Sequence, residues 1–87
     1  MNKDDQLVPE LFDISNDAFD KGYDKGLEAL AILKVDSTNL ILDLQEEIKG
    51  FEACIACANK NSDAFTFFYF VGLRFAYDEL LESINGA

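Results

Sequence analysis

From Phe65 to Tyr77 the sequence reads FTFFYFVGLRFAY, with apolar residues at nearly every position. In a helix these side chains point in every direction, so every side of the helix must be covered. Two other helices of so short a chain cover only part of it, and a large exposed apolar patch is rare on a monomer. We therefore expect a homodimer or a docking face. The residues expected on that face are Phe67, Phe70, Arg74, Tyr77 and Leu81. The alternative is a central helix that one chain buries completely.

Two more stretches have apolar residues at steps of three and four, and Gly and Pro are sparse, which indicates helices. We expect helices over about residues 16–34, 37–59 and 62–85. Residues 1–8 are predicted to form a flexible N-terminal arm, and Pro9 with Glu10 to begin a short helix within a single helical domain, residues 9–87. Short connections favour antiparallel neighbours. The predicted fold class is all-α, a small up-down-up three-helix bundle that dimerises through its C-terminal aromatic helix.

The helix ends are predicted from the residues that commonly cap helices. Ser15 or Asn16 is expected to cap the first long helix and Asp36 or Ser37 the second. Ser62 is expected to cap the third helix, and Gly86 to end it in a left-handed conformation.

A short pattern occurs twice in the chain. Asp17-Ala18-Phe19, Tyr23 and Gly26-Leu27 recur 46 residues later as Asp63-Ala64-Phe65, Tyr69 and Gly72-Leu73. The repeat predicts equivalent packing roles for the first and third helices, with each Gly allowing another helix to approach closely. The alternative is a chance likeness between two amphipathic helices.

The charge balance narrows the classes of function. The 87 residues include 17 acidic and 7 basic ones and no His, for a net charge of −10. Such a surface repels nucleic acid and anionic lipid, because phosphates are bound by clustered Lys and Arg. We expect no enzyme, no cofactor and no metal. Nothing at the N-terminus resembles a signal peptide, and the longest apolar run is too short to span a bilayer, so the expected location is cytoplasmic.

Acidic residues follow one face of the first long helix. They recur at steps of three and four over about 22 Å, and a second acidic group lies on the next helix. The first group is Asp13, Asp17, Asp20, Asp24 and Glu28, and the second is Asp43, Glu46 and Glu47. Like charges at this spacing disfavour a helix, so we interpret them as a surface that binds a basic partner protein. The alternative is a solvated face that keeps a small protein soluble.

A run of carboxylates can imitate the phosphates of duplex DNA and so block the basic groove of a DNA-handling protein. The favoured function is therefore a non-enzymatic inhibitor of a nucleic-acid enzyme, of the anti-restriction or anti-CRISPR type that phages encode. It would act in the host cytoplasm and self-associate through the aromatic helix.

Two other functions use different residues. Arg74 with Tyr69 and Tyr77 can form a nucleotide site at a dimer seam. Asp36-Ser37, at the start of an acidic helix, resembles the acyl carrier proteins, whose Asp-Ser-Leu motif carries phosphopantetheine on Ser. That resemblance implies modification of Ser37, although Thr38 stands in the place of the Leu.

Cys54 and Cys57 form a C-x-x-C pair late in the second helix. We expect them to fill the core as small apolar residues beside Phe51 and Ile55. Zinc needs four ligands, so these residues can hold it only in a symmetric site between two copies.

Overall fold

The computed structural model describes the backbone of residues 3–86 and the side chains of residues 15–86. Three helices account for most of this part: α1 (Lys3–Asp36), α2 (Leu40–Lys60) and α3 (Ala64–Gly86). Residues 3–86 contain no strand. The prediction of an all-α chain with three helices is confirmed.

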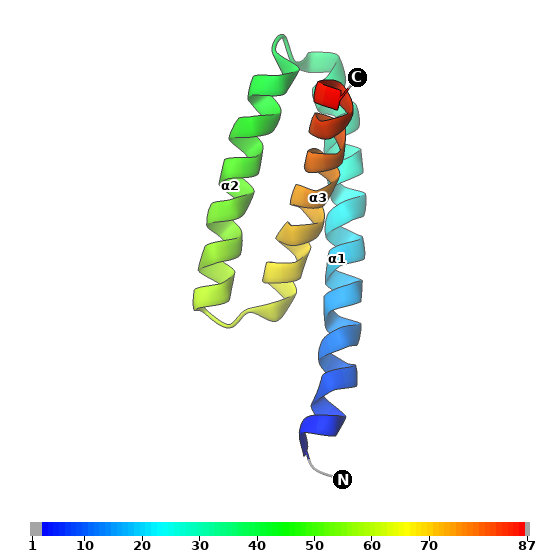
Figure 1. The fold of residues 1–87 in the computed structure, drawn as a ribbon, viewed down its shortest axis with the longest axis vertical. Coiled ribbons are helices and arrows are strands. Elements are labelled where there is room, and N and C mark those ends of the chain that lie inside the picture. The colour runs from blue at the N-terminus through cyan, green and yellow to red at the C-terminus, as the bar shows by residue number, and fades with distance from the viewer. Residues whose placement is uncertain (1–2, 87) are drawn as a thin grey trace.

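Helix α3 lies between the other two helices and contacts both of them (Figure 1). Across the described residues, α1 and α2 each pack along α3 but have only slight contact with each other. Gly22 of α1 lies beside Tyr69 of α3, and Gly26 lies beside Leu73 and Ala76. Residue numbers rise together along both helices, so α1 and α3 run parallel. The molecule is elongated, measuring 55 × 22 × 22 Å.

The first helix begins earlier than expected. The sequence predicts a flexible arm over residues 1–8, a short helix from Pro9 and a long helix from about residue 16 capped by Ser15 or Asn16. Instead α1 is one continuous helix from Lys3. Pro favours the first turn of a helix, which is why the sequence points to a start at Pro9. Beyond the first turn a Pro supplies no N–H to the helix, so α1 continues through Pro9 with one backbone hydrogen bond fewer. Residues 1 and 2 lie outside the described part.

Helix α2 begins at Leu40, because its cap is Asn39 and not the expected Asp36 or Ser37. The side-chain Oδ1 of Asn39 accepts a hydrogen bond from the Leu42 backbone N–H at 3.2 Å. The Ser37 hydroxyl instead donates to Oδ2 of Asp43 at 2.5 Å. Ser37 therefore lies in the connection between α1 and α2, and its hydroxyl is hydrogen-bonded to Asp43 in the first turn of α2.

Asp63 caps α3, in place of the expected Ser62. Its carboxylate accepts from the backbone N–H of Thr66 at 3.1 Å and from the Thr66 hydroxyl at 2.7 Å. Ser62 has a φ of 58° and reverses the chain between α2 and α3. The expected left-handed stop at Gly86 is absent, because none of the described glycines has a positive φ.

Glycines bring α1 and α3 close together. A Cβ built on Gly72 would lie 2.9 Å from the backbone nitrogen of Tyr23, and one on Gly26 would lie 2.8 Å from the Cβ of Ala76. Both distances are below ordinary van der Waals contact. The prediction that these two glycines allow a close helix approach is confirmed.

The core lies where all three helices supply side chains. Its buried members are Leu30, Leu44, Ile48, Ala76 and Tyr77. Leu44 is completely buried. The core therefore occupies the half of α3 that follows Gly72.

Candidate partner-binding surface

Four acidic residues form an exposed line along α1: Asp17, Asp20, Asp24 and Glu28, here called the acidic stripe. Successive residues of a helix are about 100° apart, so Asp24 lies on the opposite side of α1 from Gly22, which touches α3. The stripe therefore faces away from α3, as its spacing predicts. The side chain of Asp13, the fifth predicted member, lies outside the described residues.

The middle of the acidic stripe carries uncompensated charge. Asp17 pairs with Lys21 at 3.2 Å and Glu28 with Lys25 at 3.9 Å, and all four side chains are more than half exposed. Exposed ion pairs of this kind contribute little to the stability of the fold. Among the described side chains, no Lys or Arg lies within ion-pair distance of the two central residues, Asp20 and Asp24.

The second predicted acidic group does not join the stripe. Glu46 and Glu47 are exposed on α2, which has only slight contact with α1. Asp43 is half-buried and accepts the hydrogen bond of Ser37. Glu47 lies near the core, where burial and this negative charge both raise the pKa of Tyr77. The candidate surface therefore reduces to the acidic stripe on α1.

The predicted dimer or ligand face on α3 is divided by the packing of α2. Tyr77 is only 4% exposed, and its ring packs edge-on against Phe51 of α2 with centroids 4.9 Å apart. Phe70 contacts the same Phe51 at 6.1 Å, and Leu81 packs against the core. Tyr77 thus belongs to the intramolecular core and cannot line an outer face. The prediction was wrong for Tyr77 because it did not anticipate which side of α3 is covered by α2.

The first half of α3, before Gly72, is incompletely covered by the other helices. None of residues 64–71 is buried, and Phe65 is 42% exposed. Phe67, a member of the predicted face, is half-buried and packs edge-on against its neighbour Phe68 at 5.0 Å. We call residues 65–71 the aromatic run. The expectation that the chain cannot cover α3 on every side holds for this run.

The residues of the alternative nucleotide site are not gathered within one chain. Tyr69 lies on the α1 side of α3, beside Gly22, whereas Tyr77 faces α2. Arg74 pairs with Asp78 at 3.8 Å, one turn along the same helix.

Cys54 and Cys57 are both exposed, so the prediction that they fill the core was wrong. Cys57 follows Ile48 by nine residues, which places it half a turn around α2 from that buried side chain. The amide of Asn61 donates to its sulfur at 3.5 Å. Among the described residues no three metal-ligating side chains cluster together.

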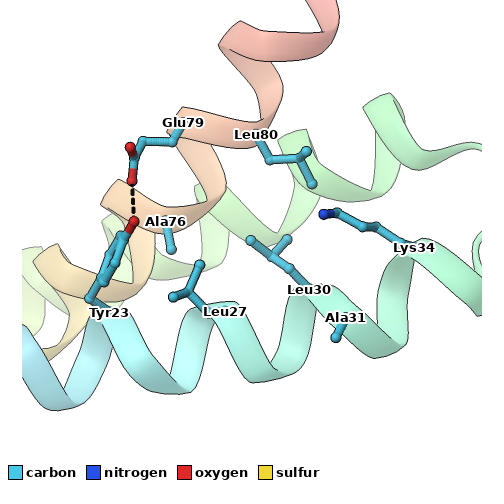
Figure 2. Close-up of a pocket in the computed structure, with 8 residues that line it drawn as sticks. All are labelled: Tyr23, Leu27, Leu30, Ala31, Lys34, Ala76, Glu79 and Leu80. Carbon is cyan, nitrogen blue, oxygen red and sulfur yellow. Dashed lines mark hydrogen bonds between the residues drawn. The ribbon is translucent and has the colours of Figure 1, made fainter.

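A shallow cavity of about 290 Å³ lies between α1 and α3 (Figure 2). At one end the Tyr23 hydroxyl donates to Oε1 of Glu79 at 2.6 Å, and this bond raises the pKa of Tyr23. The side chain of Lys34 lies at the other end, with Leu27, Leu30 and Leu80 between them. The sequence carried no signal for Glu79, which is 56 residues from Tyr23. Its carboxylate already holds the phenol, so the pair fastens α1 to α3.

No family model, curated protein or solved structure matches this chain. In the described residues, no helix has the length and apolar character needed to cross a membrane.

Proposed function

We propose that this chain is a non-enzymatic binding protein whose acidic stripe contacts a basic surface of a partner protein. The observation that carries the proposal is the position of Asp20 and Asp24, exposed on the face of α1 away from α3 and without a basic partner among the described side chains. Neighbouring carboxylates weaken a helix by about 0.2–0.5 kcal/mol per pair. A basic partner would supply the missing positive charge.

The partner surface that best fits is a groove that binds nucleic acid. Asp17 to Glu28 spans about 16 Å along α1, with one carboxylate every 4.5 to 6 Å or so. A DNA strand likewise carries a regular series of negative charges, one phosphate every 3.4 Å or so of helix axis. The chain would occupy such a groove in place of DNA, as an inhibitor of the anti-restriction or anti-CRISPR kind, and would itself bind neither nucleic acid nor membrane. Its place of action would be the cytoplasm.

The proposal includes self-association. The three helices would act as an up-down-up bundle that dimerises through α3, since the aromatic run is only partly covered within one chain. The acidic stripe lies on the far side of α1 from α3, so dimerisation through α3 would leave it free.

Charge reversal tests the stripe. Asp20→Lys, Asp24→Lys and Glu28→Lys together change the net charge by six, and so do Asp36→Lys, Glu52→Lys and Glu82→Lys at exposed positions off the stripe. The readouts are capture of partners from a lysate of the native host and duplex-DNA cleavage by restriction and guide-RNA-directed nucleases. The wild type and the off-stripe variant should capture a nucleic-acid enzyme or slow cleavage, and the stripe variant should not. Equal capture and inhibition by the stripe variant would exclude mimicry, and so would a wild type that does neither.

A further inference from the structure

The first third of α1 extends beyond the rest of the molecule. α1 and α3 run parallel and Gly22 lies against Tyr69, so the start of α3 at Ala64 is level with about residue 17 of α1. Residues 3–14, about 18 Å of helix, therefore project past the ends of α2 and α3 (Figure 1). We call this segment the α1 extension.

The sequence of the α1 extension has the pattern of a helix that packs against a neighbour. Apolar residues recur at steps of three and four, as Leu7, Leu11 and Ile14 and as Val8 and Phe12. No helix of the described part runs beside this segment. The aromatic run, about 10 Å long, begins at the same end of the molecule. One end of the chain thus holds both an apolar helical segment and an apolar surface that the chain covers only in part.

The chain exposes more surface than a compact monomer of its mass would. A compact monomer of 9.7 kDa exposes about 5,100 Å². This chain exposes 6043 Å², so the excess is about 900 Å². One partner in a standard stable interface buries about 800 Å². The elongated shape therefore exposes about as much extra surface as one partner of a standard interface buries.

We propose that a second copy of this chain covers the aromatic run with its α1 extension. A two-fold axis at this end places the extension of each copy on the aromatic run of the other, so that one symmetric contact covers both surfaces in both copies. This inference rests on the proposed self-association, of which it specifies the contact.

Dimerisation through this contact should depend on salt in the opposite way to binding of a basic partner by the acidic stripe. Each copy has a net charge of −10, so two copies repel each other, and added salt screens this repulsion. Salt should therefore tighten the dimer, whereas it should weaken binding of the acidic stripe to a basic partner. The variant with three lysines on the stripe should dimerise at least as tightly as the wild type.

Sedimentation equilibrium at low and high salt tests the proposal. Val71→Lys on the aromatic run and Leu11→Lys on the extension should each raise the dimer dissociation constant at least tenfold. Val35→Lys provides the matched control, because Val35 is 83% exposed at the far end of α1. Circular dichroism verifies that each variant is folded. A chain that stays monomeric at every concentration and salt level, or a dimer that only Val35→Lys weakens, would overturn the proposal.

A second measurement does not depend on weakening the fold. In a background with Cys54→Ala and Cys57→Ala, one copy carries Leu11→Cys and another carries Val71→Cys. Mixing and mild oxidation by oxidised glutathione should join the two thiols in a disulfide between copies, with two molecules of reduced glutathione released. Mixing Leu11→Cys with a Val35→Cys copy is the control. Equal cross-linking in both mixtures contradicts the proposed contact.

Discussion

Gly22 of α1 lies against the backbone carbonyl of Tyr69 of α3, so closely that no side chain fits between the two helices. The same holds one turn further, where Gly26 meets Ala76. Close approach brings the two backbones into van der Waals contact over several turns, and Ala18 on the same face is completely buried. The α1–α3 contact therefore leaves no room for an added side chain at Gly22 or Gly26.

Gly22→Ala should destabilise the protein by about 1–3 kcal/mol, because the added methyl group meets backbone atoms that cannot turn away. Gly50→Ala is the matched control: Gly50 lies inside α2, and nothing lies within 4 Å of the place that an added Cβ would take. The free energy of unfolding of that variant should rise by about 0.5–1 kcal/mol, since Ala loses less conformational entropy than Gly when a helix forms. Urea unfolding measures both. Equal effects at the two positions would contradict the close contact.

Leu44→Ala should lower the free energy of unfolding by about 2–5 kcal/mol, because Leu44 is completely buried in the core that the three helices form. Small domains are stable by about 5–15 kcal/mol, so this loss is a large part of the total. Leu42→Ala, two residues earlier in α2, removes the same atoms from a side chain that is 48% exposed. Its expected cost is below about 1 kcal/mol. The comparison uses chemical denaturation at one temperature, and a small loss at Leu44 would show that α2 is not packed as described.

Helix number, the positions of Gly26 and Gly72, and the outward direction of the acidic stripe could all be predicted from the sequence. Each follows from spacing along a single helix, which the 3.6-residue period determines. The aromatic run shows the same rule: an element apolar on every side cannot be covered by two neighbours, and residues 64–71 contain no buried member.

The errors concern which side of a helix meets which neighbour. Cys54 and Cys57 were expected in the core from their neighbours in sequence, Phe51 and Ile55, but α3 covers the side of α2 that bears Leu44 and Ile48, and Cys57 lies half a turn away from Ile48. The prediction of an outer face that includes Tyr77 fails for the same reason. The caps were misplaced because Ser37, Asn39, Ser62 and Asp63 are all good capping residues, and the backbone path decides among them.

Asp63→Ala should lower the melting temperature by about 5 °C, because it removes both hydrogen bonds to Thr66 at the start of α3. Those bonds lower the pKa of Asp63. The stabilising effect is therefore complete above the unfolded pKa of 3.8 and is lost as the pH falls through the lower pKa of the folded state. Melting curves of both proteins should differ at neutral pH and converge in strong acid. Ser62→Gly is the control: its φ of 58° suits Gly, so no loss is expected.

Asp78→Asn should stabilise the protein at neutral pH. Burial raises the pKa of Asp78, and Glu82 and Glu52 raise it further, while Arg74 at 3.8 Å opposes them. The folded state therefore holds this proton more tightly than the unfolded chain, so the contribution of Asp78 to stability falls as the pH rises from the unfolded pKa of 3.8 through the folded pKa. Asn carries no charge to bury, and its advantage should shrink as the pH approaches about 4. Urea unfolding of the two proteins across this range measures the difference, with Asp24→Asn on the exposed stripe as a control for the lost charge. A less stable Asp78→Asn protein at neutral pH would show that the pair with Arg74 outweighs the cost of burial.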